Sequence, residues 1–148
     1  MKKFLLLFLV LTSAAYAQSK KQILVGRWNA IDSNGQSNKM IFTSDNFISM
    51  TINGEFINGE GFQVKEGKNK GQKGFLKYEI DESKVPITLD IIASSLEKGK
   101  TIEKGRILAI VEFKSNDEIK FNISLEGKRA TSFNSSNEET TIVLKRDK

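Results

Sequence analysis

Carboxylates are the only groups left for acid–base catalysis in this sequence, because the chain contains neither histidine nor cysteine. Their absence argues against the usual zinc sites, Ser-His and Cys-His nucleophile pairs, and imidazole acid–base catalysis. The remaining candidates for acid–base work are scattered acidic residues, and no two stand at a spacing that forces a shared cleft: Asp81, Asp90, Glu103, Glu112, Asp117 and Glu118. The sequence therefore predicts no catalytic residue, no metal site, no cofactor and no enzymatic activity. An enzyme that uses carboxylates alone is kept as a third hypothesis.

The first 17 residues show the three parts of a secretion signal in order. Lys2 and Lys3 give a positive start, Phe4–Leu11 is an unbroken apolar run, and Ala15-Tyr16-Ala17 supplies small residues before a cleavage point at Gln18. The run is too short for a membrane-spanning helix of roughly 20 residues. No cysteine is present to carry a lipid anchor. We therefore expect residues 1–17 to be a signal peptide and residues 18–148 to be one exported domain, periplasmic or secreted, from a bacterium.

The predicted mature domain has only a small positive excess. Losing two lysines from 23 basic residues leaves 21, against 18 acidic ones. This excess is spread along the sequence and does not argue for a nucleic-acid partner. Without cysteines an exported chain has no disulfides, so the hydrophobic core alone must hold the fold.

The pattern of apolar and polar residues in the mature sequence predicts many short strands rather than helices. In Glu118–Leu125, apolar residues alternate strictly with polar ones, which is typical of a half-buried strand. Asn53-Gly54 and Asn58-Gly59 are expected to form tight turns, and Gln18–Ile23 and Ser94–Gly99 to form at most a helical turn each. The other expected strands are Leu24–Ile31, Lys39–Thr43, Asn46–Ile52, Gly61–Lys65, Gly74–Ile80, Pro86–Ile92, Gly105–Lys114 and Thr140–Arg146, with Glu55–Ile57 as a very short extra one.

Short strands joined by turns predict an all-β sandwich or meandering barrel. With ten strands, the last returns antiparallel to the first, and the connections sort into two rims. The long ones fall at one end: Asp32–Asn38, Glu66–Lys73, Ala93–Lys104 and Glu126–Glu139. The short ones fall at the other: Ser44-Asp45, Asn58-Gly59, Asp81–Val85 and Ser115-Asn116. This sorting favours an antiparallel up-and-down barrel of eight to ten strands with an open mouth and a closed base.

Gly26-Arg27-Trp28 on the first expected strand resembles the G-x-W motif of lipocalins. In that family the tryptophan closes the base of the barrel and an arginine from the last strand packs across it. Arg146 is the matching residue here. A guanidinium stacked on an indole contributes about 0.5–2 kcal/mol.

A longer stretch adds to this resemblance. Tyr78–Asp90 is similar to a Y-x-[IL]-D-x-[ST]-K-x-P-x-x-[IL]-D stretch in an uncharacterised bacterial lipocalin-like family known from planctomycetes. Gly105–Leu108, the turn at Ser115–Asp117, and Arg129–Phe133 follow in that family's order, with Ala130 where it has proline. The resemblance implies a lipocalin-like (calycin) barrel over nearly the whole mature chain, and no activity.

Structural roles are expected for Gly26, Trp28 and Arg146, and also for three residues of the longer resemblance. Pro86 can start a strand without losing a ladder hydrogen bond. Asp81 can accept backbone hydrogen bonds within its turn. Phe133 can fold the long loop Ala130–Glu139 down as an apolar plug.

The leading functional hypothesis is a binding protein that holds a small apolar or amphipathic molecule inside the barrel. The predicted ligand-binding residues point with the core faces of their strands: Ile48, Met50, Leu76, Tyr78 and Phe121. The same residues would equally form a filled core. The alternative is a protein-interaction module, an inhibitor or envelope assembly factor, which presents its long loops to another envelope protein.

Overall fold

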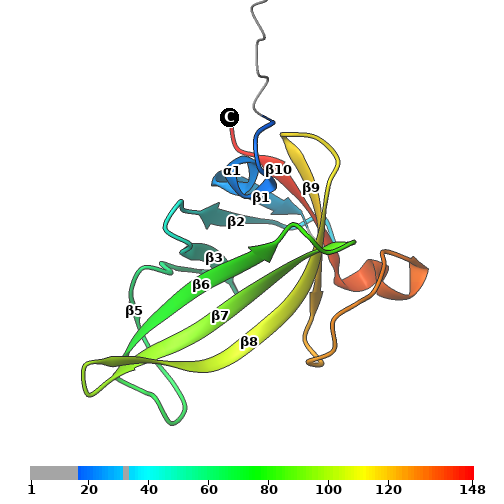
Figure 1. Cartoon of the computed structure of the whole chain (residues 1–148). Coiled ribbons are helices and arrows are strands. Elements are labelled where there is room, and N and C mark those ends of the chain that lie inside the picture. The colour runs from blue at the N-terminus through cyan, green and yellow to red at the C-terminus, as the bar shows by residue number, and fades with distance from the viewer. Residues whose placement is uncertain (1–16, 32–33) are drawn as a thin grey trace, which may run out of the picture.

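The computed structural model describes residues 17–31 and 34–148; residues 1–16 of the predicted signal peptide, and Asp32 and Ser33, lie outside the described residues. One short helix, α1 (Lys20–Leu24), precedes a series of strands (Figure 1). The elements that follow are β1 (Gly26–Ile31), β2 (Ser37–Phe42), β3 (Ile48–Ile52), β4 (Glu55–Ile57), β5 (Phe62–Gln63), β6 (Lys73–Asp81), β7 (Ile87–Glu97), β8 (Lys100–Phe113), β9 (Glu118–Ser124), the 3-10 helix η1 (Ser135–Thr140) and β10 (Thr141–Arg146).

The strands form a single antiparallel sheet in the order β4-β3-β2-β1-β10-β9-β8-β7-β6-β5. Each strand pairs with its neighbour in sequence, except that β4 and β5 do not pair and β10 closes back onto β1. The result is a nearly closed up-and-down barrel of ten strands, compatible with a lipocalin-like fold. The expected fold class, including the antiparallel return of the last strand, is confirmed.

The two ends of this barrel differ. The base end holds α1 and the short connections 43–47, 82–86 and 114–117, whereas the loop end holds residues 64–73 and the tip of the β7–β8 hairpin (Figure 1). The antiparallel pairing of β2, β3 and β4 places the Asn53-Gly54 turn at the loop end too. Residues 125–140, which we call the strap, leave β9 at the loop end and return to β10 there.

Alternating side chains of the strands fill the interior. Large residues from both sides of the barrel are fully buried there, including Trp28, Phe42, Tyr78 and Phe121. The rings of Phe42 and Tyr78 meet edge to face with centroids 5.2 Å apart, an arrangement that aromatic pairs favour. The core therefore runs across the barrel from β2 to β9.

At the base end, Trp28 is covered by Arg146. The two residues are register partners on β1 and β10, and the Arg146 guanidinium carbon lies 4.2 Å from the centre of the indole ring. The indole Nε1 donates to the Leu24 carbonyl at 2.7 Å. Arg146 also donates to the carbonyls of Ile23 and Asn116, at 2.5 Å from Nη2 and 3.0 Å from Nε. One side chain thus joins β1, β10, α1 and the β8–β9 turn.

Gly26 and the start of α1 support this arrangement. Gly26 has φ +137°, and a Cβ there would lie 2.8 Å from Nη1 of Arg146, so a side chain would compete with the guanidinium for space. α1 begins with a capping box, in which the Ser19 hydroxyl accepts from the Gln22 amide and the Gln22 side chain accepts from the Ser19 amide.

The gap between β4 and β5 is narrowed by Gly59. Its carbonyl accepts from the Leu76 amide at 2.9 Å, its amide donates to the Ser49 hydroxyl at 2.9 Å, and a Cβ would lie 1.9 Å from the Ile48 carbonyl oxygen. The expected tight turn is present at Asn58-Gly59, where the Gly61 amide donates to the Asn58 carbonyl at 3.2 Å, but Gly59 does not have a positive φ. Its missing side chain lets the backbone pass between β3 and β6. Asn53-Gly54 is the expected turn, with φ +51° and +80°.

The prediction of a loop at Ala93–Lys104 is wrong. β7 and β8 run on through it, with a bulge near Ser94 and a turn at Lys98-Gly99, where φ is +47° and +77°. Serine, threonine and charged residues dominate this stretch, so its hydrophobic alternation is weak. Backbone pairing in the ladder, which does not depend on side-chain polarity, extends the hairpin.

Candidate functional site

The five residues predicted to bind a ligand belong to the packed interior. Ile48, Leu76, Tyr78 and Phe121 are buried members of the core, and Met50 packs against it. The Tyr78 hydroxyl donates to the Thr43 carbonyl at 2.7 Å, and burial, with the charge of Asp45, raises the pKa of the Tyr78 phenol. These contacts fix Tyr78 as part of the fold.

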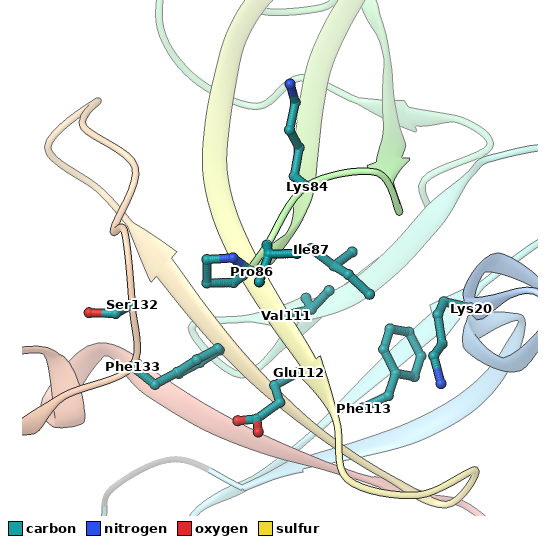
Figure 2. Close-up of a pocket in the computed structure, with 10 residues that line it drawn as sticks. Lys20, Lys84, Pro86, Ile87, Val111, Glu112, Phe113, Ser132 and Phe133 are labelled. Carbon is teal, nitrogen blue, oxygen red and sulfur yellow. The ribbon is translucent and has the colours of Figure 1, made fainter.

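An apolar groove lies at the base end instead, with a volume of about 500 Å³ (Figure 2). We call it the base groove. Its walls come from four separate parts of the chain: α1, the β6–β7 connection, the end of β8 and the strap. The residues that line it are Lys20, Lys84, Val85, Pro86, Ile87, Val111, Glu112, Phe113, Ser132 and Phe133.

Pro86, Ile87 and Val111 lie between the rings of Phe113 and Phe133, which stand on opposite sides of the groove in Figure 2. Val85 is 99% exposed, although it is apolar. Ligand sites commonly combine such apolar walls with a few polar groups, in volumes of roughly 300–1,000 Å³. The base groove has the size and composition of a small-molecule site.

The β6–β7 connection presents Val85 and Pro86 at the groove. Asp81 begins it by accepting from the amide and hydroxyl of Ser83, at 3.0 Å and 2.5 Å. These hydrogen bonds hold the pKa of Asp81 below its ordinary value. The Val85-Pro86 peptide bond is cis, and β7 begins at Ile87, one residue later than expected.

The strap presents Phe133 on the outside of the barrel wall. Arg129 holds the strap to that wall, since its Nη1 lies 2.6 Å from an Asp90 carboxylate oxygen and donates to the Ala109 carbonyl at 2.8 Å. Farther along, the buried Asn122 amide donates to the Asn137 carbonyl at 3.1 Å. Polar contacts thus fix both sides of the segment that carries Phe133.

Asp90 is the centre of a charge network on this wall. Its second oxygen accepts from Arg106 at 3.0 Å, and Arg106 also binds Glu79 and Glu103. Burial alone would raise the pKa of Asp90, but the hydrogen bonds and charges of Arg129 and Arg106 outweigh it and hold that pKa below its ordinary value. Asp90 is therefore ionised at neutral pH and holds the strap through Arg129.

The rim of the base groove is cationic. Within the described part of the chain, neither Lys20 nor Lys84 has a carboxylate within ion-pair distance, and the Lys20 ammonium lies 5.3 Å from the centre of the Phe113 ring. The groove's carboxylate, Glu112, is neutralised by Lys114 at 2.6 Å. The balance of charge favours an anionic group on a ligand.

Sequence reasoning gave Pro86 and Phe133 only structural roles and did not single out Val85 or Phe113. One signal was present in the sequence, because Val85 is an apolar residue in an otherwise polar turn next to proline. Lys20 and the strap could not be placed beside that turn without the tertiary structure.

Residues 17–31 and 34–148 contain no group of three or more acidic side chains that could hold a metal ion. The same ranges contain no helix long and apolar enough to cross a membrane.

Comparisons with protein-family models, curated proteins and solved structures find no match to this chain. The class of protein is accordingly given by its fold, a ten-stranded, nearly closed antiparallel barrel compatible with the lipocalin-like fold.

Proposed function

We propose that this chain is an exported, non-enzymatic, lipocalin-like binding protein that holds a small amphipathic molecule in the base groove. The observation that carries the proposal is the 500 Å³ groove walled by Val85, Pro86, Phe113 and Phe133 at the base end. The site differs from the barrel interior favoured by the sequence, because the residues expected there pack against one another.

Lys20 and Lys84, at the edge of the base groove, narrow the class of ligand. When the apolar part of a ligand packs against Pro86 and Phe133, its acidic end lies within the electrostatic field of Lys20 and Lys84. A neutral apolar molecule gains only the contact with the walls. We expect an anionic amphipath to bind more tightly than an uncharged one of the same size.

The test is a fluorescence titration with anilinonaphthalene sulfonate, an anionic apolar probe, and with an uncharged naphthylamine of similar size. The folded protein should bind the anionic probe more tightly. Phe133→Ala should weaken binding about tenfold or more, since a buried apolar side chain contributes roughly 1.5–3 kcal/mol.

Val85→Ser and Leu125→Ser make a matched pair for this titration. Both remove an exposed apolar side chain, 99% and 81% exposed, but only Val85 lines the groove. Val85→Ser should weaken binding of the anionic probe, and Leu125→Ser should leave that binding unchanged. Equal affinity in Phe133→Ala, Val85→Ser and wild type would reject the groove as the site.

Export is tested separately, by expressing the full chain in a bacterium and measuring the mass of the product outside the cytoplasm. We expect the mature protein to begin at Gln18. An uncleaved chain retained in the cytoplasm would contradict this part of the proposal and leave the groove titration unaffected.

A further inference from the structure

The fold gathers lysines that the sequence spreads out. Two segments carry them, residues 64–73 between β5 and β6 and residues 97–104 around the β7–β8 turn. Gly74 pairs with Ser95, so Lys73 lies beside Leu96. The end of the first segment therefore lies next to the start of the second, at the loop end (Figure 1). We call these two segments together the lysine rim.

The lysine rim holds the whole positive excess of the predicted mature chain. It contains seven lysines and three glutamates, which leaves 14 basic and 15 acidic residues for the rest of residues 18–148. The charge is therefore distributed unevenly, with a cationic loop end on an otherwise nearly neutral barrel. The sequence-based view of an evenly spread charge does not hold in three dimensions.

Ion pairs neutralise only part of this rim. Lys65 pairs with Glu55, and Lys104 pairs with Glu97. Among the described residues, five lysines of the rim have no carboxylate within ion-pair distance, and all five are exposed: Lys68, Lys70, Lys73, Lys98 and Lys100. These ammonium groups are free to meet an external anion.

Exposed apolar side chains lie at the same end. Of the six large hydrophobic residues that are exposed in the described chain, all but Val85 belong to the loop end or its immediate strands. Leu96 and Ile102 lie on the β7–β8 hairpin itself, Ile52 and Phe56 flank the Asn53-Gly54 turn, and Leu125 follows β9. Lysines and exposed apolar side chains together are typical of surfaces that lie in a membrane interface.

We propose that the loop end is a peripheral docking surface for an anionic phospholipid bilayer. Lysines near such a surface are attracted by its negative potential, while short apolar side chains enter the boundary between headgroups and acyl chains. The unpaired cations of the rim are all lysines, and the exposed apolar residues on the same hairpin, Leu96 and Ile102, are aliphatic. A nucleic-acid surface would instead favour arginine forks and aromatic stacking platforms.

The experiment is flotation of the purified mature protein with vesicles of phosphatidylglycerol and phosphatidylcholine, and with vesicles of phosphatidylcholine alone, at low and high salt. We expect binding to the anionic vesicles only, weakened by salt because surface charges are screened. Lys70→Glu/Lys100→Glu should lower the affinity at least tenfold, given that each lysine near an anionic surface contributes about fivefold.

Lys145→Glu/Lys148→Glu is the matched control, since it changes the net charge equally at the C-terminal end of β10. It should bind as wild type does. Leu96→Ser/Ile102→Ser should weaken binding and leave its salt dependence unchanged. Thermal unfolding is measured for every variant, and Lys70→Gln/Lys100→Gln replaces the glutamate pair where that pair unfolds the protein.

Several outcomes would overturn the inference: equal binding to phosphatidylcholine alone, equal losses in the rim and control variants, or no vesicle binding alongside salt-sensitive binding to an oligonucleotide. The result does not depend on the base groove, because the rim variants should still bind anilinonaphthalene sulfonate as wild type does. The proposed function and the membrane surface can thus fail separately.

Discussion

At the base end, Trp28 is buried beneath Arg146, whose guanidinium reaches the carbonyls of Ile23 and Asn116. At the loop end, the hairpin tip and residues 64–73 are mostly exposed, and ion pairs such as Lys65–Glu55 join side chains that water surrounds. The bonds from Trp28 to the Leu24 carbonyl and from Arg146 to the Ile23 carbonyl withdraw polar groups from water and supply their partners. The ion pair of Lys65 with Glu55 exchanges one solvated partner for another.

This difference separates stability from recognition. A buried donor or acceptor that loses its partner costs about 1–3 kcal/mol, whereas an exposed ion pair contributes about 0–1 kcal/mol. We therefore expect the base end to determine whether the barrel folds. The loop end is free to carry charge and apolar side chains for binding, at little cost to the fold.

The largest effect is expected from Arg146→Ala. The change removes the contact with Trp28 and leaves carbonyls of Ile23 and Asn116 without their donor, so the free energy of unfolding should fall by roughly 3 kcal/mol or more. Urea unfolding followed by Trp28 fluorescence measures it.

Arg27→Ala is the control for this change, because Arg27 is an exposed arginine one residue from Trp28. Its effect should stay within about 0.5 kcal/mol. Similar losses in the two variants would mean that Arg146 does not join the base end as its contacts indicate.

An intermediate effect is expected from Asp90→Asn, which weakens the attachment of the strap to the barrel wall. The neutral amide loses the charge that Arg129 and Arg106 bind, and stability at neutral pH should fall by about 1–2 kcal/mol. Glu79→Gln, which changes an exposed partner of Arg106, should cost less.

The Asp90 effect should depend on pH in a defined direction. The folded-state pKa of Asp90 is lowered, so its stabilisation is complete above the ordinary aspartate pKa of about 3.9 and is lost as pH falls through the lower folded value. Unfolding curves of wild type and Asp90→Asn should converge in acid. A difference that persists there would show that the carboxylate's charge is not the cause.

The smallest effect is expected from Glu55→Gln at the loop end. The ion pair with Lys65 is exposed on both sides, 52% and 68%, so its loss should change the free energy of unfolding by less than about 0.5 kcal/mol. A loss comparable to that of Arg146→Ala would remove the contrast between the two ends.

Much of the fold could be predicted because strand alternation and turn residues are local signals. Ile119, Phe121 and Ile123 alternate over one strand, and Asn53-Gly54 has the residue types that its turn requires. The prediction of Ala93–Lys104 as a loop was wrong because paired polar strands lack such a signal. The passage of the backbone at Gly59 between β3 and β6 could not be predicted either. It depends on contacts with Ile48 and Leu76, which are 11 and 17 positions away in the sequence.

The candidate site was less predictable than the fold. The residues expected to bind a ligand were chosen because they face inward, and facing inward is also what core residues do. The base groove depends on Phe133 meeting Pro86, which requires the strap to fold back along the wall through Arg129 and Asp90. No spacing in the sequence records that contact.

The sequence by itself determined the absence of histidine and cysteine chemistry and the alternation that makes strands, because these follow from residue type and order. The packing of Arg146 on Trp28 was expected only through the resemblance to lipocalins, and the structure confirms it. Only the tertiary structure decided that the interior is packed with the expected ligand residues, that an apolar groove opens at the base end, and that dispersed lysines gather at the loop end. The physical reason is that cavities and surface fields depend on which distant segments closure of the sheet brings together.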